Sequence, residues 1–75
     1  MKQCLICRRQ AEIHHIKTRG SGGTDEPFNL APLCREHHTE IHMKGNSYMA
    51  NKYKPFKDFL ESHGWEFFNE KWRRF

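Results

Sequence analysis

The sequence lacks any long apolar run, and its apolar content is modest. Hydrophobic residues make up 36% of the 75 positions, 29% of the residues are charged, and the mean hydropathy is −0.97. No segment approaches the roughly 20 apolar residues that a membrane-spanning helix needs. So short a chain also buries too little apolar surface to be stable without a further constraint. The composition predicts one soluble, cytoplasmic domain over residues 1–75, with no membrane partner and with some additional staple.

Cysteine is scarce as well, and the three cysteines do not suit a disulfide framework. Their number is odd, and no apolar segment of a secretory leader follows Met1. Two thiols with the spacing Cys4-x-x-Cys7 form half of a tetrahedral zinc site. A redox CxxC motif would instead need a thioredoxin-like βαβ context, which so short a chain cannot provide. Metal binding is therefore the better interpretation of the cysteines.

Acidic residues are outnumbered by basic ones, with 9 Asp and Glu against 13 Lys and Arg. The net charge of +4 favours an anionic partner such as nucleic acid, although a surplus of this size is common among ordinary proteins. The glycine-containing run 18–27 matches neither a GxGxxG nor a P-loop pattern, so it does not indicate a nucleotide cradle. It is predicted to be a surface connection, or alternatively a loop from whose edge Lys17 and Arg19 reach phosphates.

The densest group of metal-binding side chains lies between Cys34 and His42. On a helix, Cys34 and His37 share one face, while His38 and His42 share another. At about 100° per residue, the mean directions of the two pairs differ by roughly 90°. One helix, ended by Gly45, can therefore present ligands to two separate metals.

Cys34 and His37 can complete the half-site that begins at the N-terminus. The resulting Cys3His set ties the first residues of the chain to the helix as a structural zinc site. A C2H2 finger does not fit, because 26 residues separate Cys7 and Cys34 where about a dozen would be expected. The predicted structural zinc ligands are Cys4, Cys7, Cys34 and His37.

Two further histidines are adjacent in a segment, 11–17, that most resembles a short strand. Neighbouring residues on a strand point to opposite faces, so His14 and His15 cannot both bind one metal in a regular strand. One of them is free to act on a substrate; alternatively, both are ordinary surface histidines. A second short strand is predicted over 28–33, where Asn29 is either a turn residue or holds a catalytic imidazole by a hydrogen bond.

The spacing His38-x-x-x-His42 also occurs in zinc metalloproteases, but the rest of that motif is missing. Such enzymes need Glu directly after the first His, and Thr39 stands there. The nearby Glu40 projects roughly 180° away from the histidine pair. A protease is therefore not indicated.

The C-terminal part, 45–75, reads as a helical and aromatic extension. Helices are predicted over about 47–53, capped by Ser47, and over 56–62, with Pro55 in the first turn and Gly64 after the end. A final strand is predicted over 65–68, and the aromatic side chains are expected to pack in the core, or alternatively to stack on bases of a nucleic acid. Lys52 and Lys54 belong to a basic stretch that is either a solvated face or a contact to phosphates.

Taken together, His14-His15, Asn29 and the His38/His42 pair, framed by Cys4-x-x-Cys7 and Cys34-x-x-His37, resemble the HNH endonuclease family over residues 4–44. The resemblance implies an α+β fold: a small ββα-metal (His-Me finger) domain with a structural zinc site and a C-terminal extension. Many members with this second knuckle have cysteine at the position of His37, and histidine ligates zinc well.

The resemblance also implies roles for the residues. His14, His38 and His42 would ligate a catalytic divalent cation, His15 would be the general base, and Asn29 would orient His15. Phosphodiester hydrolysis requires such a cation on the phosphate and such a base for the water. Three imidazoles favour Zn²⁺, Ni²⁺, Co²⁺ or Mn²⁺, while Mg²⁺ prefers oxygen ligands.

The implied function is metal-dependent cleavage of DNA, by nicking or by double-strand cutting, in a monomer or small homodimer. The cofactors would be one structural Zn²⁺ and one catalytic ion, which is Mg²⁺, Mn²⁺, Ni²⁺, Co²⁺ or Zn²⁺. The alternative is a non-catalytic zinc-binding module for nucleic acid, in which the histidine cluster is only structural. His15 and Asn29 distinguish the two, because a binding module needs neither a base nor a residue to orient it.

Overall fold

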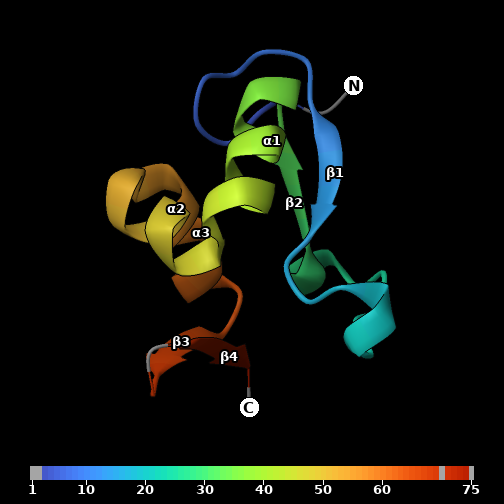
Figure 1. Cartoon of the computed structure of the whole chain (residues 1–75), viewed down its shortest axis with the longest axis vertical. Helices are drawn as coiled ribbons and strands as arrows, with labels where there is room; N and C mark the ends of the chain where they lie inside the picture. The colour runs from blue at the N-terminus through green and yellow to red at the C-terminus, as the bar shows by residue number, and fades with distance from the viewer. Residues whose placement is uncertain (1–2, 70, 75) are drawn as a thin grey trace.

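The computed structural model describes residues 3–69 and 71–74. Within these residues the chain forms two antiparallel hairpins and three α-helices, which confirms the predicted α+β class. Figure 1 shows α1 against the β1–β2 hairpin, α2 and α3 beside α1, and the β3–β4 hairpin at the far end of the molecule. The elements are β1 (Glu12–His15), the 3-10 turns η1 (Arg19–Ser21) and η2 (Pro27–Asn29), β2 (Leu30–Leu33), α1 (Arg35–Lys44), α2 (Asn46–Lys52), α3 (Lys54–Ser62), β3 (Trp65–Phe68) and β4 (Lys71–Arg74).

A tight turn near the N-terminus carries the Cys4-x-x-Cys7 pair. The Arg8 amide donates to the Cys4 carbonyl at 3.0 Å, and Arg8 has a φ of 64°, which reverses the chain direction. The Leu5 amide donates to the Pro32 carbonyl at 3.0 Å and joins this turn to β2. Figure 1 shows this N-terminal turn beside the start of α1.

The β1–β2 hairpin sets the directions of the two adjacent histidines. His14 lies opposite Ala31 and His15 opposite Leu30 in the antiparallel register. His14 is buried and contacts the His38 ring on α1, while His15 is only partly buried. The period-2 alternation of a strand therefore separates their surroundings, as the sequence predicts. The strand itself is shorter than the predicted segment 11–17.

The ends of α1 differ slightly from the sequence prediction. Cys34 is not within the helix but is its N-cap residue, with extended backbone at φ −66° and ψ 166°. At the other end the Gly45 amide donates to the Ile41 carbonyl at 2.7 Å, and a φ of 90° suits glycine. Gly45 is also the N-cap residue of α2, so the prediction that Ser47 caps this helix is wrong.

The core lies beneath α1 and between α2 and α3. Leu33, Met49, Phe56 and Leu60 are fully buried, and Ile41 joins them from α1. The α3 helix begins at Lys54, two residues before the predicted start, with Pro55 in its first turn. Phe56 and Leu60 form the buried apolar face of this helix.

The aromatic residues of the C-terminal hairpin do not all pack inward. Trp65 is 7% exposed and its indole N–H donates to the Phe28 carbonyl at 2.7 Å. By contrast, Phe67 and Phe68 are 54% and 55% exposed, so the expectation of core packing fails for these two. The strand predicted over 65–68 is confirmed; its partner β4, which was not predicted, places Trp72 beside Phe67.

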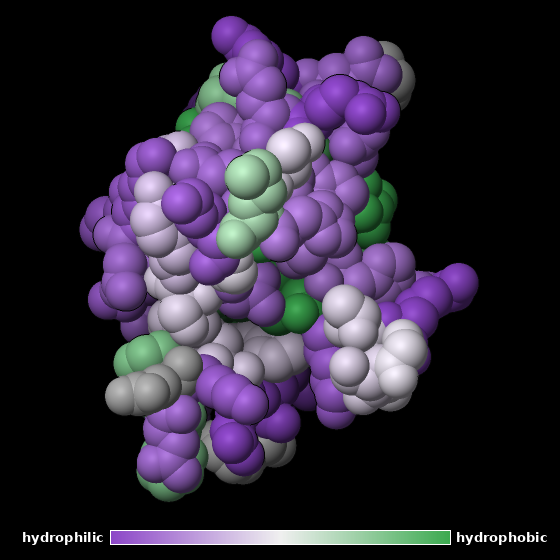
Figure 2. Space-filling view, viewed as in Figure 1, coloured by the Kyte–Doolittle hydropathy of each residue, from purple (hydrophilic) through white to green (hydrophobic). Residues whose placement is uncertain are grey.

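Polar residues cover most of the face shown in Figure 2, and hydrophobic residues appear there only in small, separate patches. No helix among the described residues is both long and apolar enough to cross a bilayer.

Candidate metal centres and active site

The first cluster of metal-binding atoms joins the N-terminal turn to α1. Nδ1 of His37 lies 3.2 Å from Sγ of Cys34 and 3.6 Å from Sγ of Cys4, and the Cys7 and Cys34 sulfurs are 3.6 Å apart. With Zn–S of ~2.3 Å and Zn–N of ~2.0 Å, the ligand atoms of a tetrahedral site lie about 3.5–3.8 Å apart. The ligand atoms of these four side chains lie close enough together to bind one zinc ion.

The electrostatics of the thiols also fit a cation. Burial by itself raises the pKa of Cys4, but hydrogen bonds from the backbone at Cys34, Cys7 and Ile6 lower that pKa to about 6. Burial raises the pKa of Cys34, and the neighbouring Cys7 and Cys4 sulfurs raise it further. Cys4 therefore ionises readily, whereas the neighbouring sulfurs disfavour a second negative charge on Cys34. A bound zinc ion would stabilise both thiolates.

The second cluster contains His14 from β1 with His38 and His42 from α1. One ring nitrogen of each lies within 4.8 Å of the others, and the Nε2 atoms of His38 and His42 are 3.1 Å apart. Nε2 of His14 is buried and has no hydrogen-bond partner among the described residues. A buried nitrogen without a partner, beside two more imidazoles, fits a divalent cation with three nitrogen ligands.

His14 is held in the neutral form that a metal requires. Burial lowers the pKa of His14 to about 4, against a hydrogen bond with the Asn46 side chain that raises it. The nearby His38 and His42 imidazoles lower that pKa further. At neutral pH the His14 side chain is therefore available as a ligand rather than as a cation.

A carboxylate and an arginine lie behind His38. Nδ1 of His38 is 3.0 Å from Oε1 of Glu12, and Oε2 of Glu12 accepts a hydrogen bond from Arg35 at 3.0 Å. The hydrogen bond with His38, followed by the charge of Arg35, lowers the pKa of Glu12. Glu12 is thus an ionised hydrogen-bond acceptor next to Nδ1 of His38, the ring nitrogen that does not face His42.

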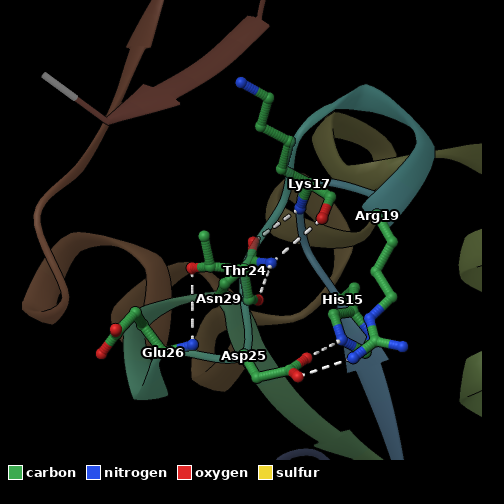
Figure 3. Close-up of polar contacts among 7 residues, drawn as sticks. All are labelled: His15, Lys17, Arg19, Thr24, Asp25, Glu26 and Asn29. Carbon is green, nitrogen blue, oxygen red and sulfur yellow. Dashed lines mark hydrogen bonds and ion pairs between the residues drawn. The ribbon is translucent and has the colours of Figure 1, made fainter.

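His15 is held by an acid from the loop between β1 and β2. Its Nε2 lies 2.9 Å from Oδ1 of Asp25, and Oδ2 of Asp25 accepts a hydrogen bond from Arg19 at 2.7 Å, as Figure 3 shows. The hydrogen bonds with His15 and Arg19 lower the pKa of Asp25. The His15 ring is 28% exposed, so solvent reaches it.

Asn29 does not hydrogen-bond to His15, in contrast to the role implied by the family resemblance. Its amide is 1% exposed and bonds to the backbone: Oδ1 accepts from the Lys17 amide at 2.7 Å, and Nδ2 donates to the Lys17 and Thr24 carbonyls at 3.0 and 2.7 Å. Figure 3 shows these bonds closing the loop that carries Asp25. Asn29 thus shapes the loop, and Asp25 makes the contact with the imidazole.

The loop between β1 and β2 also has a close backbone contact at Gly23. A Cβ at Gly23 would lie 1.8 Å from the Lys17 carbonyl oxygen, so only glycine fits. The Gly23 amide donates to the Thr18 carbonyl at 2.8 Å. The predicted surface connection is therefore a specific structure, and it places Asp25 against His15.

Sequence reasoning missed Glu12, Asp25 and Asn46. Glu12 could have been predicted, because it precedes His14 by two residues and a strand puts both on one face. Asp25 and Asn46 carried no comparable signal, since their positions depend on how a loop and a helix junction pack.

The four basic residues expected to touch phosphates have different surroundings. Lys52 forms an ion pair with Glu40 at 2.8 Å, and Lys54 forms one with Asp58 at 3.0 Å. Glu40 is on the face of α1 turned away from the His38/His42 pair, so Lys52 lies away from the histidine cluster. Arg19 is paired with Asp25, while the Lys17 side chain extends away from these contacts in Figure 3.

Comparison with known proteins gives one match. The model of the HNH endonuclease family matches residues 3–44, which is more than half of the chain. No curated protein and no solved structure matches it. The matched range holds both ligand clusters, and its β1, β2 and α1 form the two strands and the helix of the ββα-metal fold. The chain therefore belongs to the HNH endonuclease family.

Proposed function

We propose that this protein is a metal-dependent endonuclease that hydrolyses phosphodiester bonds in DNA, as a monomer or small homodimer. The observation that carries the proposal is the pair of adjacent histidines on β1. His14 contacts the rings of His38 and His42, whereas His15 contacts Asp25. One strand thereby supplies a metal ligand and, next to it, an imidazole that is left for acid–base chemistry.

His14, His38 and His42 would hold the catalytic cation through ring nitrogens. When bound, a divalent cation supplies positive charge that stabilises the negative charge developing on the phosphate and on the leaving oxygen. Three nitrogen ligands favour Mn²⁺, Co²⁺, Ni²⁺ or Zn²⁺, and Mg²⁺ is the oxygen-preferring alternative. The structural zinc would stay with its cysteines and take no part in the reaction.

His15 would act as the general base. Asp25 is ionised and can only accept a hydrogen bond, so the neutral His15 ring carries its proton on Nε2 and keeps a lone pair on Nδ1. Nδ1 then takes a proton from water as the water oxygen bonds to phosphorus and the bond to the leaving oxygen breaks. The Asp25 carboxylate at 2.9 Å would stabilise the resulting imidazolium.

Substrate binding would rely on basic groups beside His15. Lys17 and Arg19 leave the end of β1 and can reach phosphates flanking the reacting one. Contacts of this kind give affinity that is largely independent of sequence and that weakens with salt. Arg19, Lys52 and Lys54 are weaker candidates than Lys17, because a carboxylate already pairs with each of them.

The test is cleavage of supercoiled plasmid by the wild type and by His15→Ala, with Mg²⁺, Mn²⁺, Ni²⁺ or Co²⁺ and with chelator. His63→Ala is the matched control, because His63 lies at the end of α3 and bonds to the Phe59 carbonyl there. The wild type and the control should yield nicked or linear plasmid with at least one ion. His15→Ala should be slower by ~10²–10⁴-fold, with unchanged zinc content.

Two results would contradict the proposal. One is that no ion supports cleavage, and the other is that His15→Ala cuts as fast as the wild type. A protein that retards DNA in gels with every ion but never cuts it would be the non-catalytic zinc-binding module.

A further inference from the structure

The two ring nitrogens of His38 have different neighbours. Nδ1 lies 3.0 Å from the Glu12 carboxylate, and Nε2 lies 3.1 Å from Nε2 of His42. A carboxylate only accepts hydrogen bonds, so Nδ1 of His38 must carry a hydrogen. In the neutral ring this leaves the lone pair on Nε2, on the side of the histidine cluster.

Asn46 makes the same selection for His14. The Asn46 side chain lies close enough to His14 to influence its pKa through hydrogen bonding, and since Nε2 of His14 is buried without a partner, we infer that Asn46 faces Nδ1. Nδ2 of Asn46 donates to the Ile16 carbonyl at 3.0 Å, and Oδ1 is then available to accept a hydrogen bond from His14. In that arrangement Nδ1 of His14 carries the hydrogen, and Nε2 keeps its lone pair.

We propose that Glu12 and Asn46 are positioning residues of the histidine site. Each accepts a hydrogen bond from Nδ1 of one imidazole and so directs the Nε2 lone pair of that imidazole toward the cation. The inference depends on the part of the proposed function that gives the histidine cluster a cation, and it does not depend on DNA cleavage.

The two residues come from different parts of the fold, and each is itself anchored. Arg35 donates to the second oxygen of Glu12 and keeps it in the ionised, accepting form. Asn46 is the first residue of α2 and bonds to the backbone just after β1. The segment after Gly45 thus does more than pack against the ββα unit, because it supplies one of the groups that orient the site.

The expected effect is on metal affinity. Groups that hold the second nitrogen of a ligating histidine fix its tautomer and ring direction, and their loss typically weakens metal binding by ~10–100-fold. Nε2 of His42 lies 3.1 Å from Nε2 of His38, so in the absence of a cation it can donate a hydrogen bond to the lone pair that Glu12 selects. By fixing the His38 lone pair on the side of the histidine cluster, Glu12 favours the cation-bound state of the site.

The test uses the zinc-loaded protein and a titration with Co²⁺, followed by its visible absorption. Glu12→Ala and Asn46→Ala should each weaken Co²⁺ binding by ~10–100-fold. Glu12→Gln, which keeps an accepting oxygen, should restore most of the affinity. Glu36→Ala is the matched control, because Glu36 is an exposed acid at the start of α1 that pairs with Arg9 and should leave affinity unchanged.

A second readout reports the tautomers directly. Long-range ¹H–¹⁵N spectra of the zinc-loaded protein without a second ion should show the hydrogen on Nδ1 in both His14 and His38. Retention of zinc by each variant shows that the fold is intact, so weaker Co²⁺ binding is not a folding defect. Hydrogens on Nε2, or unchanged Co²⁺ affinity in both alanine variants, would overturn the proposal even if the enzyme cuts DNA. Failure to cut DNA would leave these measurements unaffected.

Discussion

Loss of the structural zinc should unfold the protein, and the size of the effect follows from how little else holds its N-terminal part. The perturbation is Cys34→Ser, which removes the ligand that lies 3.2 Å from His37 and 3.6 Å from Cys7. Cys34 and Cys4 are themselves buried members of the hydrophobic core. Apart from the ligands, the turn that holds Cys4 and Cys7 is joined to the rest of the chain by the hydrogen bond from Leu5 to β2, by the exposed Arg9–Glu36 ion pair, and by partial packing of Leu5 and Ile6 against the core.

The magnitudes decide the outcome. At ~0.05–0.15 kcal/mol per residue, a domain of this length has a net stability of about 4–11 kcal/mol. Structural zinc in finger peptides contributes an apparent ~10–16 kcal/mol. Losing the ion therefore removes at least as much free energy as the folded state has in reserve, and zinc-free protein should be largely unfolded.

The assay is thermal unfolding followed by circular dichroism, with zinc content measured on the same samples. Cys34→Ser, or the wild type with a strong chelator, should lose the cooperative transition. His42→Ala is the matched control on the same helix, because His42 is exposed and belongs to the other cluster. A Cys34→Ser protein that unfolds cooperatively near the wild-type temperature without zinc would refute this reasoning.

Four further outcomes are expected. Because burial lowers the pKa of His14 from 6.5 to about 4, the unfolded chain takes up this proton first as pH falls. The contribution of His14 to the free energy of unfolding is thus complete above about pH 6.5 and is lost progressively toward about pH 4. Urea unfolding should therefore show roughly 1 kcal/mol less stability at about pH 5.5 than at about pH 7.5. His14→Gln should remove this difference. Asn29→Ala leaves three backbone groups without their partner and should cost about 2 kcal/mol, with faster hydrogen exchange at the Lys17 amide; exchange at the wild-type rate would contradict the role in closing the loop. Asp25→Asn should slow plasmid cleavage by ~10-fold or more at unchanged metal content, and an unaltered rate would remove Asp25 from the mechanism. Lys17→Glu should weaken DNA binding at low salt more than Lys52→Glu does, since Lys52 is already paired with an acid, and the reverse order would mean that DNA lies along α2.

The parts of the site that were predictable from sequence are those fixed by the period of one element. A helix turns by about 100° per residue, so the separation of the Cys34/His37 and His38/His42 pairs follows from spacing alone. A strand alternates, so the different surroundings of His14 and His15 follow from their being adjacent. The Cys-x-x-Cys spacing, which is typical of zinc sites, then indicated that Cys4 and Cys7 complete the first pair.

The parts that were not predictable depend on packing between elements. Asp25 reaches His15 because a tight glycine and the Asn29 amide close the loop in one shape, and no periodicity encodes that shape. Asn46 reaches His14 because α2 starts directly at the Gly45 turn. The family resemblance implied that Asn29 orients His15, whereas in the structure the hydrogen bond with His15 is made by Asp25.

The C-terminal hairpin illustrates the same limit. The run of aromatic residues indicated a buried strand, yet Phe67 and Phe68 are exposed while Trp65 is buried. Phe68 lies on the opposite face of the strand from Trp65, while Phe67 shares the face of Trp65 but lies farther along the hairpin, beside Trp72, so composition alone could not tell which aromatic residues pack.

The central claim is that α1 supplies ligands to two separate ions, and anomalous diffraction tests it most directly. Crystals of the zinc-loaded protein soaked in Mn²⁺ or Co²⁺ should show a zinc peak among Cys4, Cys7, Cys34 and His37, together with a peak of the soaked metal among His14, His38 and His42. A single peak at the cysteines, with none at the histidines after either soak, would contradict the account.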